Sequence, residues 1–142
     1  MVSFRSRPLS SFLPGLPAAK PILSVGEGNE RVALLSVKVE GALSQEGALA
    51  SLREGLSRLQ QLLANISKGG AALPSGTFEL GFTTEHDGLI RTVLRNNSTL
   101  TGSGAEDLMQ QFVGLAMSCK WRFAQSGGQS LVQAVFGIGP KL

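Results

Sequence analysis

Six aliphatic side chains recur every three or four residues between Ser44 and Gly70. They are Leu49, Leu52, Leu56, Leu59, Leu63 and Ile66. This spacing matches the period of an α-helix and predicts one long helix with a single apolar stripe. Ser44 is placed to cap the N-terminus of this helix, and Lys68 and Gly69 mark its end. Because an amphipathic helix must bury its stripe, the rest of the chain has to provide an apolar surface.

Segments with apolar side chains at every second position lie before and after this helix and predict the strands of a sheet. Residues 31–40 form the first of them. Val32 and Leu34 lie on one face of this predicted strand, and four further apolar side chains lie on the other. Those four are Ala33, Leu35, Val37 and Val39.

A hairpin is predicted after the helix. Its outgoing strand, residues 77–83, has three large apolar side chains on one face, which are Phe78, Leu80 and Phe82. Asp87 and Gly88 supply the turn, since glycine adopts positive φ without strain. The return strand, residues 89–95, has Ile90, Thr92 and Leu94 on one face.

Residues 103–119 predict a second helix, in which Ser103 and Glu106 form a capping box. The apolar stripe of this helix consists of Leu108, Phe112, Leu115 and Cys119. Trp121 and Phe123 follow the helix and are predicted to fill the junction between it and the sheet.

A last strand over residues 129–139 completes the pattern, with Val132, Ala134, Phe136 and Ile138 on one face. The order of strand, helix, strand, strand, helix and strand predicts an α+β fold, with a mainly antiparallel sheet and two helices packed on one face. This domain is predicted to occupy residues 31–142. Residues 1–30 hold four of the six prolines and predict a disordered tail or linker.

The charge distribution argues against a nucleic-acid partner. The net charge of +3 is explained by Arg5, Arg7 and Lys20, because the first 26 residues contain no acid. Removing these three from the thirteen basic residues leaves ten, which equals the number of acidic residues. A neutral folded part lacks the basic surface that phosphate backbones attract. No transmembrane segment is predicted either, since no apolar run approaches the roughly eighteen residues that a bilayer requires.

The sequence assigns no catalytic, cofactor-binding or metal-binding residue. His86 is the only histidine and lies in the hairpin turn, where a solvated side chain is expected. Cys119 is the only cysteine, and its place in an apolar stripe predicts a packing role. One histidine and one cysteine make a poor metal site, and no catalytic motif accompanies them. A protein that is not an enzyme and needs no cofactor is predicted.

Three segments in a fixed order carry a resemblance to a known family. They read VKVEGALSQEGALASLREGLSRLQQLL, then LPSGTFELGFTTEHDGLIRTVLRNNSTL, then LMQQFVGLAMSCKWRFAQSGGQSLVQAVFGI. Together they resemble the TonB-like C-terminal domains of the AgmX/PglI type, which often end longer envelope or surface proteins, including some with VIT and von Willebrand A domains. The resemblance implies a TonB C-terminal-like fold and a protein-interaction role in the cell envelope.

The chain departs from this family at several positions. Members often carry a cysteine in each helix, where this chain has Leu62, Leu63 and Val113. The disulfide that the resemblance implies is therefore missing, and the single cysteine does not support an envelope location. Ala124 stands where the family usually has proline.

Two functions follow as hypotheses. The first is an interaction module that binds a partner segment by adding it to a sheet edge. The second is a structural or homodimerising terminal domain with no separate ligand. The last strand has no charge and no proline to guard an edge, so it is predicted to be the partner-binding edge. The residues assigned to this edge are Leu131, Gln133, Val135 and Gly137.

Overall fold

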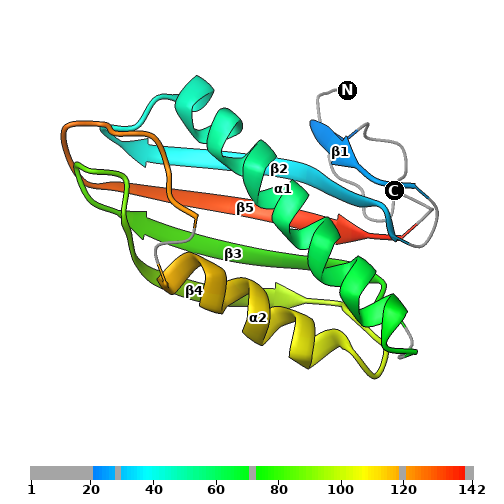
Figure 1. The fold of residues 1–142 in the computed structure, drawn as a ribbon. Helices are drawn as coiled ribbons and strands as arrows, with labels where there is room; N and C mark the ends of the chain where they lie inside the picture. The colour runs from blue at the N-terminus through cyan, green and yellow to red at the C-terminus, as the bar shows by residue number, and fades with distance from the viewer. Residues whose placement is uncertain (1–20, 28–29, 71–72, 119–120, 140–142) are drawn as a thin grey trace, which may run out of the picture.

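The structure is a computed structural model, which describes residues 21–27, 30–70, 73–118 and 121–139 (Figure 1). Its elements in chain order are β1 (Leu23–Val25), β2 (Val32–Gly41), α1 (Gln45–Lys68), β3 (Gly76–Thr84), β4 (Ile90–Ser98), α2 (Ala105–Met117) and β5 (Ser130–Ile138). Cys119 lies outside the described residues, so its predicted packing role stays a prediction.

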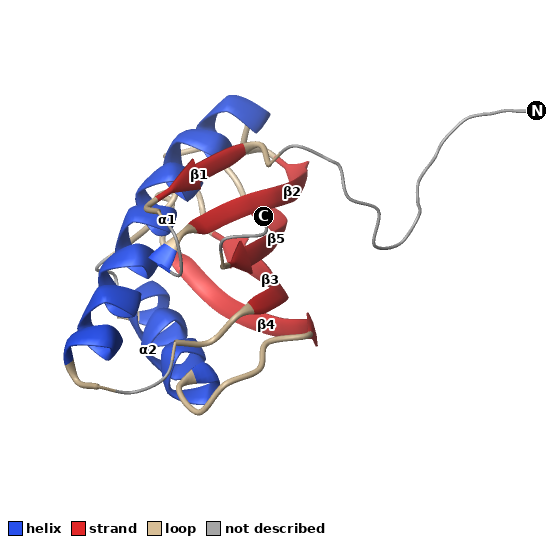
Figure 2. Cartoon of the chain, turned by 90° about the vertical axis from the view of Figure 1, so that its right-hand side faces the viewer, coloured by secondary structure: helices blue, strands red, loops and turns tan. Residues whose placement is uncertain are grey.

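The five strands form one sheet in the order β1-β2-β5-β3-β4, and every neighbouring pair is antiparallel. Figure 1 shows both helices crossing the same face of this sheet, and Figure 2 shows the two layers from the end, with the helices on one side only. The predicted α+β fold is therefore confirmed. Each helix connects two strands that are separated by a third, because β5 lies between β2 and β3, and β3 lies between β4 and β5.

The predicted apolar stripe of α1 is confirmed, with only Leu49 half-buried. The helix begins where Ser44 Oγ accepts a hydrogen bond from the backbone N–H of Gly47 at 3.0 Å. It ends at Lys68, just before two glycines. Its stripe packs on the apolar face of the sheet, where Phe78, Phe82 and Phe136 are buried.

The predicted capping box of α2 is wrong. The helix begins one residue later, with Gly104 at its N-cap and no side chain bonded to its free N–H groups. Glu106 instead binds Arg95 of β4. The buried side of α2 consists of Leu108, Met109, Phe112 and Ala116, and Leu115 is half-buried.

Extra residues in β2 and β4 change which side chains share a face. The pairing of β2 with β5 shifts between Leu34 and Ser36, so Leu35 is an additional residue. The strand therefore turns over at Leu35, and Val37 and Val39 lie on the same face as Val32 and Leu34. The predicted opposition of these two pairs is wrong because a β-bulge reverses the alternation.

In β4 the same effect occurs at Arg91. Ile90 is buried opposite Thr84, whereas Thr92 and Leu94 pair with Thr83 and Gly81 and are exposed. The alternation predicts Ile90, Thr92 and Leu94 on one face, and this prediction is wrong. The additional residue at Arg91 reverses the strand, so Ile90 lies on the opposite face from Thr92 and Leu94.

Residues 121–128 fasten the second helix to the rest of the fold. Trp121 and Phe123 are both buried, at 2% and 3% exposure, which confirms their predicted place between helix and sheet. The indole N–H of Trp121 donates to the carbonyl oxygen of Ser51 in α1 at 2.9 Å. The backbone N–H of Phe123 donates to the carbonyl oxygen of Gly88 in the hairpin turn at 2.9 Å.

The predicted tail is wrong in part. Leu23, Ser24 and Val25 form β1 and pair with β2, so the sheet begins before residue 31. The rest of residues 1–30 lies largely outside the described part of the chain. Within the described residues, neither helix combines the length and apolarity that crossing a membrane would require.

Candidate partner-binding edge

The strand predicted as the partner-binding edge is the central strand of the sheet. Residues of β5 pair with β2 on one side and with β3 on the other along the whole strand. Leu131, for example, lies between Glu40 and Thr83, and Gly137 lies between Ala33 and Thr77. The prediction for β5 is therefore wrong.

The four predicted residues do lie on one face of the sheet, the one opposite the helices. Leu131, Gln133 and Val135 are half-buried there, and Gly137 is buried. The error has a physical reason. A strand without charge or proline suits a sheet interior as well as an unguarded edge, and only the strand order distinguishes the two.

The two edges of the sheet are β1 with part of β2, and β4. β1 covers only Val32 to Leu34, so Ser36 to Glu40 of β2, which pair with β5 on their inner side, have no strand on their outer side among the described residues. Lys38 and Glu40 lie on this stretch, with 4.0 Å between Nζ and Oε2. Charged side chains of this kind discourage strand addition. In the described part of the chain β4 is the longer uncovered edge; it has nine residues, of which only Ile90 is buried.

Hydrogen bonds fix which backbone groups of β4 are free. The carbonyl of Thr77 accepts from the N–H of Thr99 at 2.8 Å, so the backbone groups of Thr77 point toward β4. Because β3 pairs with β5 without interruption, the same holds at every second residue, and hence at Gly81. Gly81 pairs with Leu94, whose N–H and C=O therefore point inward, and those of Val93 and Arg95 point away from the sheet.

Two β-bulges limit this edge. One lies at Arg91 and the other at Asn96 and Asn97, where these two residues of β4 lie opposite one residue of β3, Glu79. Bulges twist a strand and interrupt pairing, which protects natural edges. The regular stretch between them is Thr92 to Arg95, so an added strand would pair chiefly through Val93 and Arg95.

α2 lies above β4 and is joined to it by an ion pair. Both terminal guanidinium nitrogens of Arg95, Nη1 and Nη2, donate to the carboxylate of Glu106 at 2.9 Å, and Gln110 Nε2 lies 3.5 Å from the same carboxylate. The hydrogen bond from Arg95 lowers the pKa of the Glu106 carboxyl and raises that of the guanidinium. Both side chains are largely exposed, so this pair positions α2 over β4 more than it stabilises the fold.

The lowered pKa gives a testable pH dependence. Because the folded-state pKa of Glu106 lies below the ordinary 4.5, the ion pair stabilises the fold above that value. The contribution is lost as the pH falls through the folded-state pKa. Carboxyl NMR titration should give Glu106 a pKa below 4.5, Arg95→Gln should raise it toward 4.5, and Arg91→Gln should leave it lowered. A Glu106 pKa at or above 4.5 in the unmodified protein would contradict the pair.

Proline substitutions test the direction of the backbone groups. Val93→Pro removes an N–H that points away from the sheet, whereas Leu94→Pro removes one that bonds to β3. We expect Leu94→Pro to lose about 1–3 kcal/mol more unfolding free energy than Val93→Pro, after each is corrected by its alanine variant. Urea denaturation gives these four values. Equal losses would contradict the opposite directions assigned to the two N–H groups.

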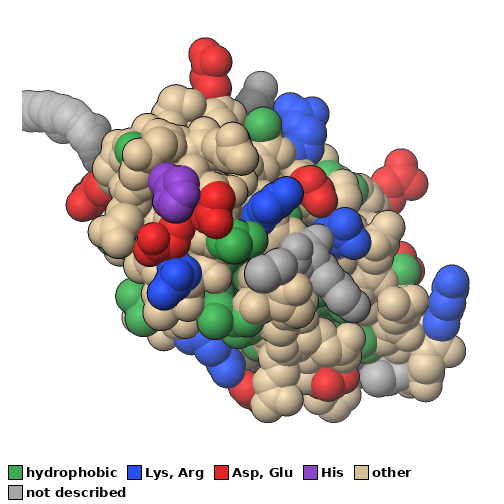
Figure 3. Space-filling view, turned by 60° about the vertical axis from the view of Figure 1, so that its left-hand side comes forward, with side chains coloured by type: hydrophobic (Ala, Val, Ile, Leu, Met, Phe, Trp, Pro, Cys, Tyr) green, Lys and Arg blue, Asp and Glu red, His purple; other side chains and the backbone are tan. Residues whose placement is uncertain are grey.

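Other features of the surface give weaker grounds for a functional site. A hollow of about 400 Å³ at the end of β2, β3 and β5 is lined by Glu40, Gly41, Thr83, Thr84, Glu85, Gln129, Ser130 and Leu131. Figure 3 shows acidic side chains around the exposed histidine. No group of three or more His, Cys, Asp or Glu side chains with metal-binding geometry occurs in the described part of the chain. The solvated position predicted for His86 is confirmed, since its side chain is exposed.

Comparison with known proteins adds no relative. No protein-family model, no curated protein and no solved structure matches the chain. The resemblance to TonB-like domains therefore stays a prediction.

Proposed function

We propose that this chain is a non-catalytic protein-interaction module that binds an extended partner segment by strand addition at β4. The observation that carries the proposal is the outward direction of the backbone groups of Val93 and Arg95 on an exposed edge. Backbone pairing supplies affinity in this mode of recognition, and side chains at alternate positions supply selectivity. The TonB-like resemblance, which implies such a role in an envelope protein, supports the same function.

β4 is favoured over the other uncovered edge for two reasons. The exposed part of β2 carries a lysine and a glutamate side by side, which would be desolvated by an added strand. β4 between its bulges carries one charged side chain, Arg95, and Glu106 already neutralises it. An added strand at β4 therefore buries no unpaired charge in the regular stretch.

Selection from a displayed peptide library tests the proposal. We expect the full chain to enrich extended peptides that slow amide exchange at Val93 and Arg95. Val93→Pro should lose these peptides, because the outward N–H is replaced by a ring that blocks approach. Val39→Pro is the matched control and should retain them, because the N–H of Val39 points away from the sheet at the β2 edge. Ala42 N–H bonds to the carbonyl of Gln129 next to β5, so the inward groups of β2 are those of Lys38 and Glu40. The proposal fails if no peptide is enriched, or if the enriched peptides protect Ser36 to Glu40.

The same measurement distinguishes the homodimer. A second copy of the chain would protect the β4 amides without any peptide, and the protection would increase with protein concentration. Protection that depends on concentration in this way would support the homodimerising domain in place of the interaction module.

A further inference from the structure

The spacing of residues along α2 shows which of its side chains face the β4 edge. Glu106 faces β4, because Arg95 binds it. Residues four, seven and eleven positions later lie on the same side of a helix. We call this set the α2 flank, and it consists of Glu106, Gln110, Val113 and Met117. The opposite side of α2 faces α1, since Asp107 and Gln111 line a hollow together with Asn65 and Ile66.

The α2 flank is apolar at the end near the hairpin turn. α2 runs opposite to β4 (Figure 1), so Met117 lies toward the beginning of the strand. From Glu106 to Met117 the helix advances roughly 16 Å, and from Arg95 back to Arg91 the strand covers roughly 13 Å. Met117 therefore lies near the beginning of β4, beside Arg91, and Val113 lies near the level of Thr92 and Val93.

Exposed apolar side chains border the β4 edge on both faces. Met117 is 47% exposed on the helix side, and Leu94 is 52% exposed on the open face of the sheet. Single exposed apolar side chains are ordinary. Met117 and Leu94, however, border the same outer edge of β4 from its two faces. A strand added at this edge would cover both side chains. Residues paired directly across a sheet share a face, so an apolar residue opposite Val93 would contact the α2 flank, and one opposite Leu94 would contact Leu94.

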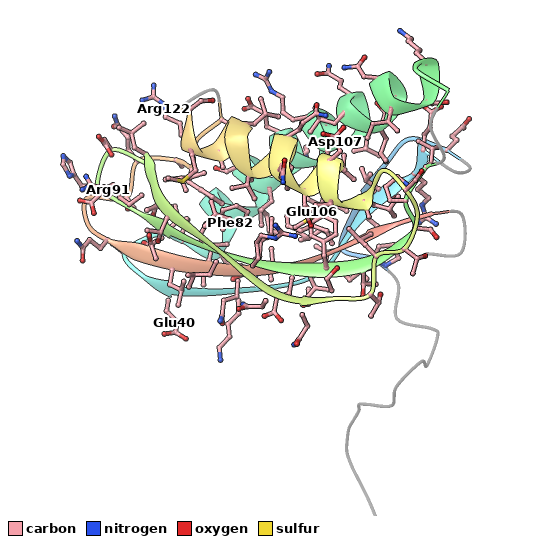
Figure 4. All side chains as sticks on the ribbon, turned by 90° about the horizontal axis from the view of Figure 1, so that it is seen from below. Glu40, Phe82, Arg91, Glu106, Asp107 and Arg122 are labelled. Atoms are coloured by element: carbon pink, nitrogen blue, oxygen red, sulfur yellow. The ribbon has the colours of Figure 1, made fainter. Side chains whose placement is uncertain are left out.

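Unpaired positive charge lies at the same end. Arg91 and Arg122 are both exposed, and no carboxylate lies within ion-pair distance of either in the described residues. The bond between Phe123 and Gly88 holds the segment that carries Arg122 against the turn before β4. Figure 4 shows the two arginines at the same end of the molecule, with Glu106 farther along α2.

We propose that the segment bound at β4 is an acidic, apolar peptide. It places apolar side chains opposite Val93 and Leu94, and a carboxylate beside Arg91 and Arg122. This inference rests on the proposed function, because it specifies the occupant of the same edge. The carboxylate sets the register, since an ion pair at one end of a short regular stretch allows one alignment of the two strands.

Three capped hexapeptides test the occupant. The first reads Asp-Thr-Val-Val-Thr-Asp, with an acid at each end so that either strand direction is served. The second has lysine in place of both acids, and the third has threonine in place of both valines. We expect the first to shift the NMR amide signals of Val93 and Arg95 at millimolar concentration. The other two should bind at least about fivefold more weakly.

Charge reversal on the protein gives the matched control. Arg91→Glu should lower affinity for the first peptide roughly fivefold or more and raise it for the lysine peptide. Arg53→Glu makes the same charge change on an exposed position of α1 and should alter neither affinity by more than about twofold. Met117→Gln should weaken the first peptide and leave the threonine peptide unchanged.

The outcomes separate this inference from the function on which it rests. If the three peptides bind β4 with equal affinity, or if Arg91→Glu and Arg53→Glu have equal effects, the acidic and apolar occupant is wrong and strand addition at β4 stands. If no peptide shifts the β4 amides, or if the shifts fall on β2, both the occupant and the proposed edge are wrong.

Discussion

Trp121→Ala should lose about 3–5 kcal/mol of unfolding free energy, the range found when a large buried aromatic side chain is truncated. The indole is 2% exposed, stacks on Phe112 at 5.5 Å between ring centroids, and meets Phe82 edge to face at 5.3 Å. Truncation also leaves the carbonyl of Ser51 without its indole donor. Domains of this size are stable by only about 5–15 kcal/mol, so one residue carries a large share of the stability.

The measurement is urea denaturation followed by circular dichroism, because the variant lacks the only tryptophan. Phe123→Ala serves as a second truncation, since Phe123 packs on Trp121 with 5.4 Å between centroids. Losses below about 1 kcal/mol for both variants would contradict the aromatic junction between helix and sheet.

A glycine in α1 provides an internal control on the same contact. A methyl group at Gly55 would lie 2.5 Å from Cζ2 of Trp121, so Gly55→Ala should destabilise the unmodified protein. In the Trp121→Ala background the clash is removed, and alanine should gain up to about 1 kcal/mol from its higher helix propensity. A reversal of sign between the two backgrounds is expected. The same sign in both would mean that the indole does not lie against Gly55.

Gly88→Ala is the second substitution with a large expected effect, and it should lose about 3 kcal/mol or more of unfolding free energy. Gly88 has φ of +84°, which side-chain-bearing residues rarely adopt. A Cβ atom there would also lie 2.0 Å from the carbonyl oxygen of Phe123, which is backbone and cannot rotate away. The hairpin turn would separate from the segment after α2, and the bond from Phe123 N–H to Gly88 would be lost.

Gly127→Ala separates the two causes. Gly127 has nearly the same φ, +79°, and no atom lies within 4 Å of a Cβ at that position. It therefore carries only the backbone strain, about 1–2 kcal/mol. The clash is the difference between the two variants, measured as unfolding free energies. Equal losses for Gly88→Ala and Gly127→Ala would show that the turn and the segment after α2 are not in contact.

The sequence predicts α1, the hairpin and β5 because each depends on local periodicity. The stripe from Leu52 to Ile66 is buried in the structure as its helical spacing predicts. Phe78 to Phe82 likewise bury every second side chain, as the alternation of a strand predicts. β1 escapes prediction because three residues between prolines and glycines have too little pattern. The capping box at Ser103 fails because Arg95, which lies on β4 outside the helix, binds the glutamate that the cap requires.

The bulges mark the limit of local reasoning in the strands. Leu35 and Arg91 are unremarkable as sequence, and yet each reverses the alternation that follows it. A bulge turns the side chains that follow it to the other face, so its position reflects a balance between the packing of the two ends of the strand. This balance depends on the neighbouring strand, which the sequence of one strand does not contain.

The sequence by itself determined the class of fold, the two amphipathic layers and the absence of a recognisable catalytic motif, because these depend on composition and local period. Only the tertiary structure decided which strand is an edge. The pattern of β5 indicates an edge, but the crossovers through α1 and α2 bring β5 to the centre and leave β4 outside. The candidate site lies on β4 for this reason, since backbone groups become available to a partner only where the sheet ends.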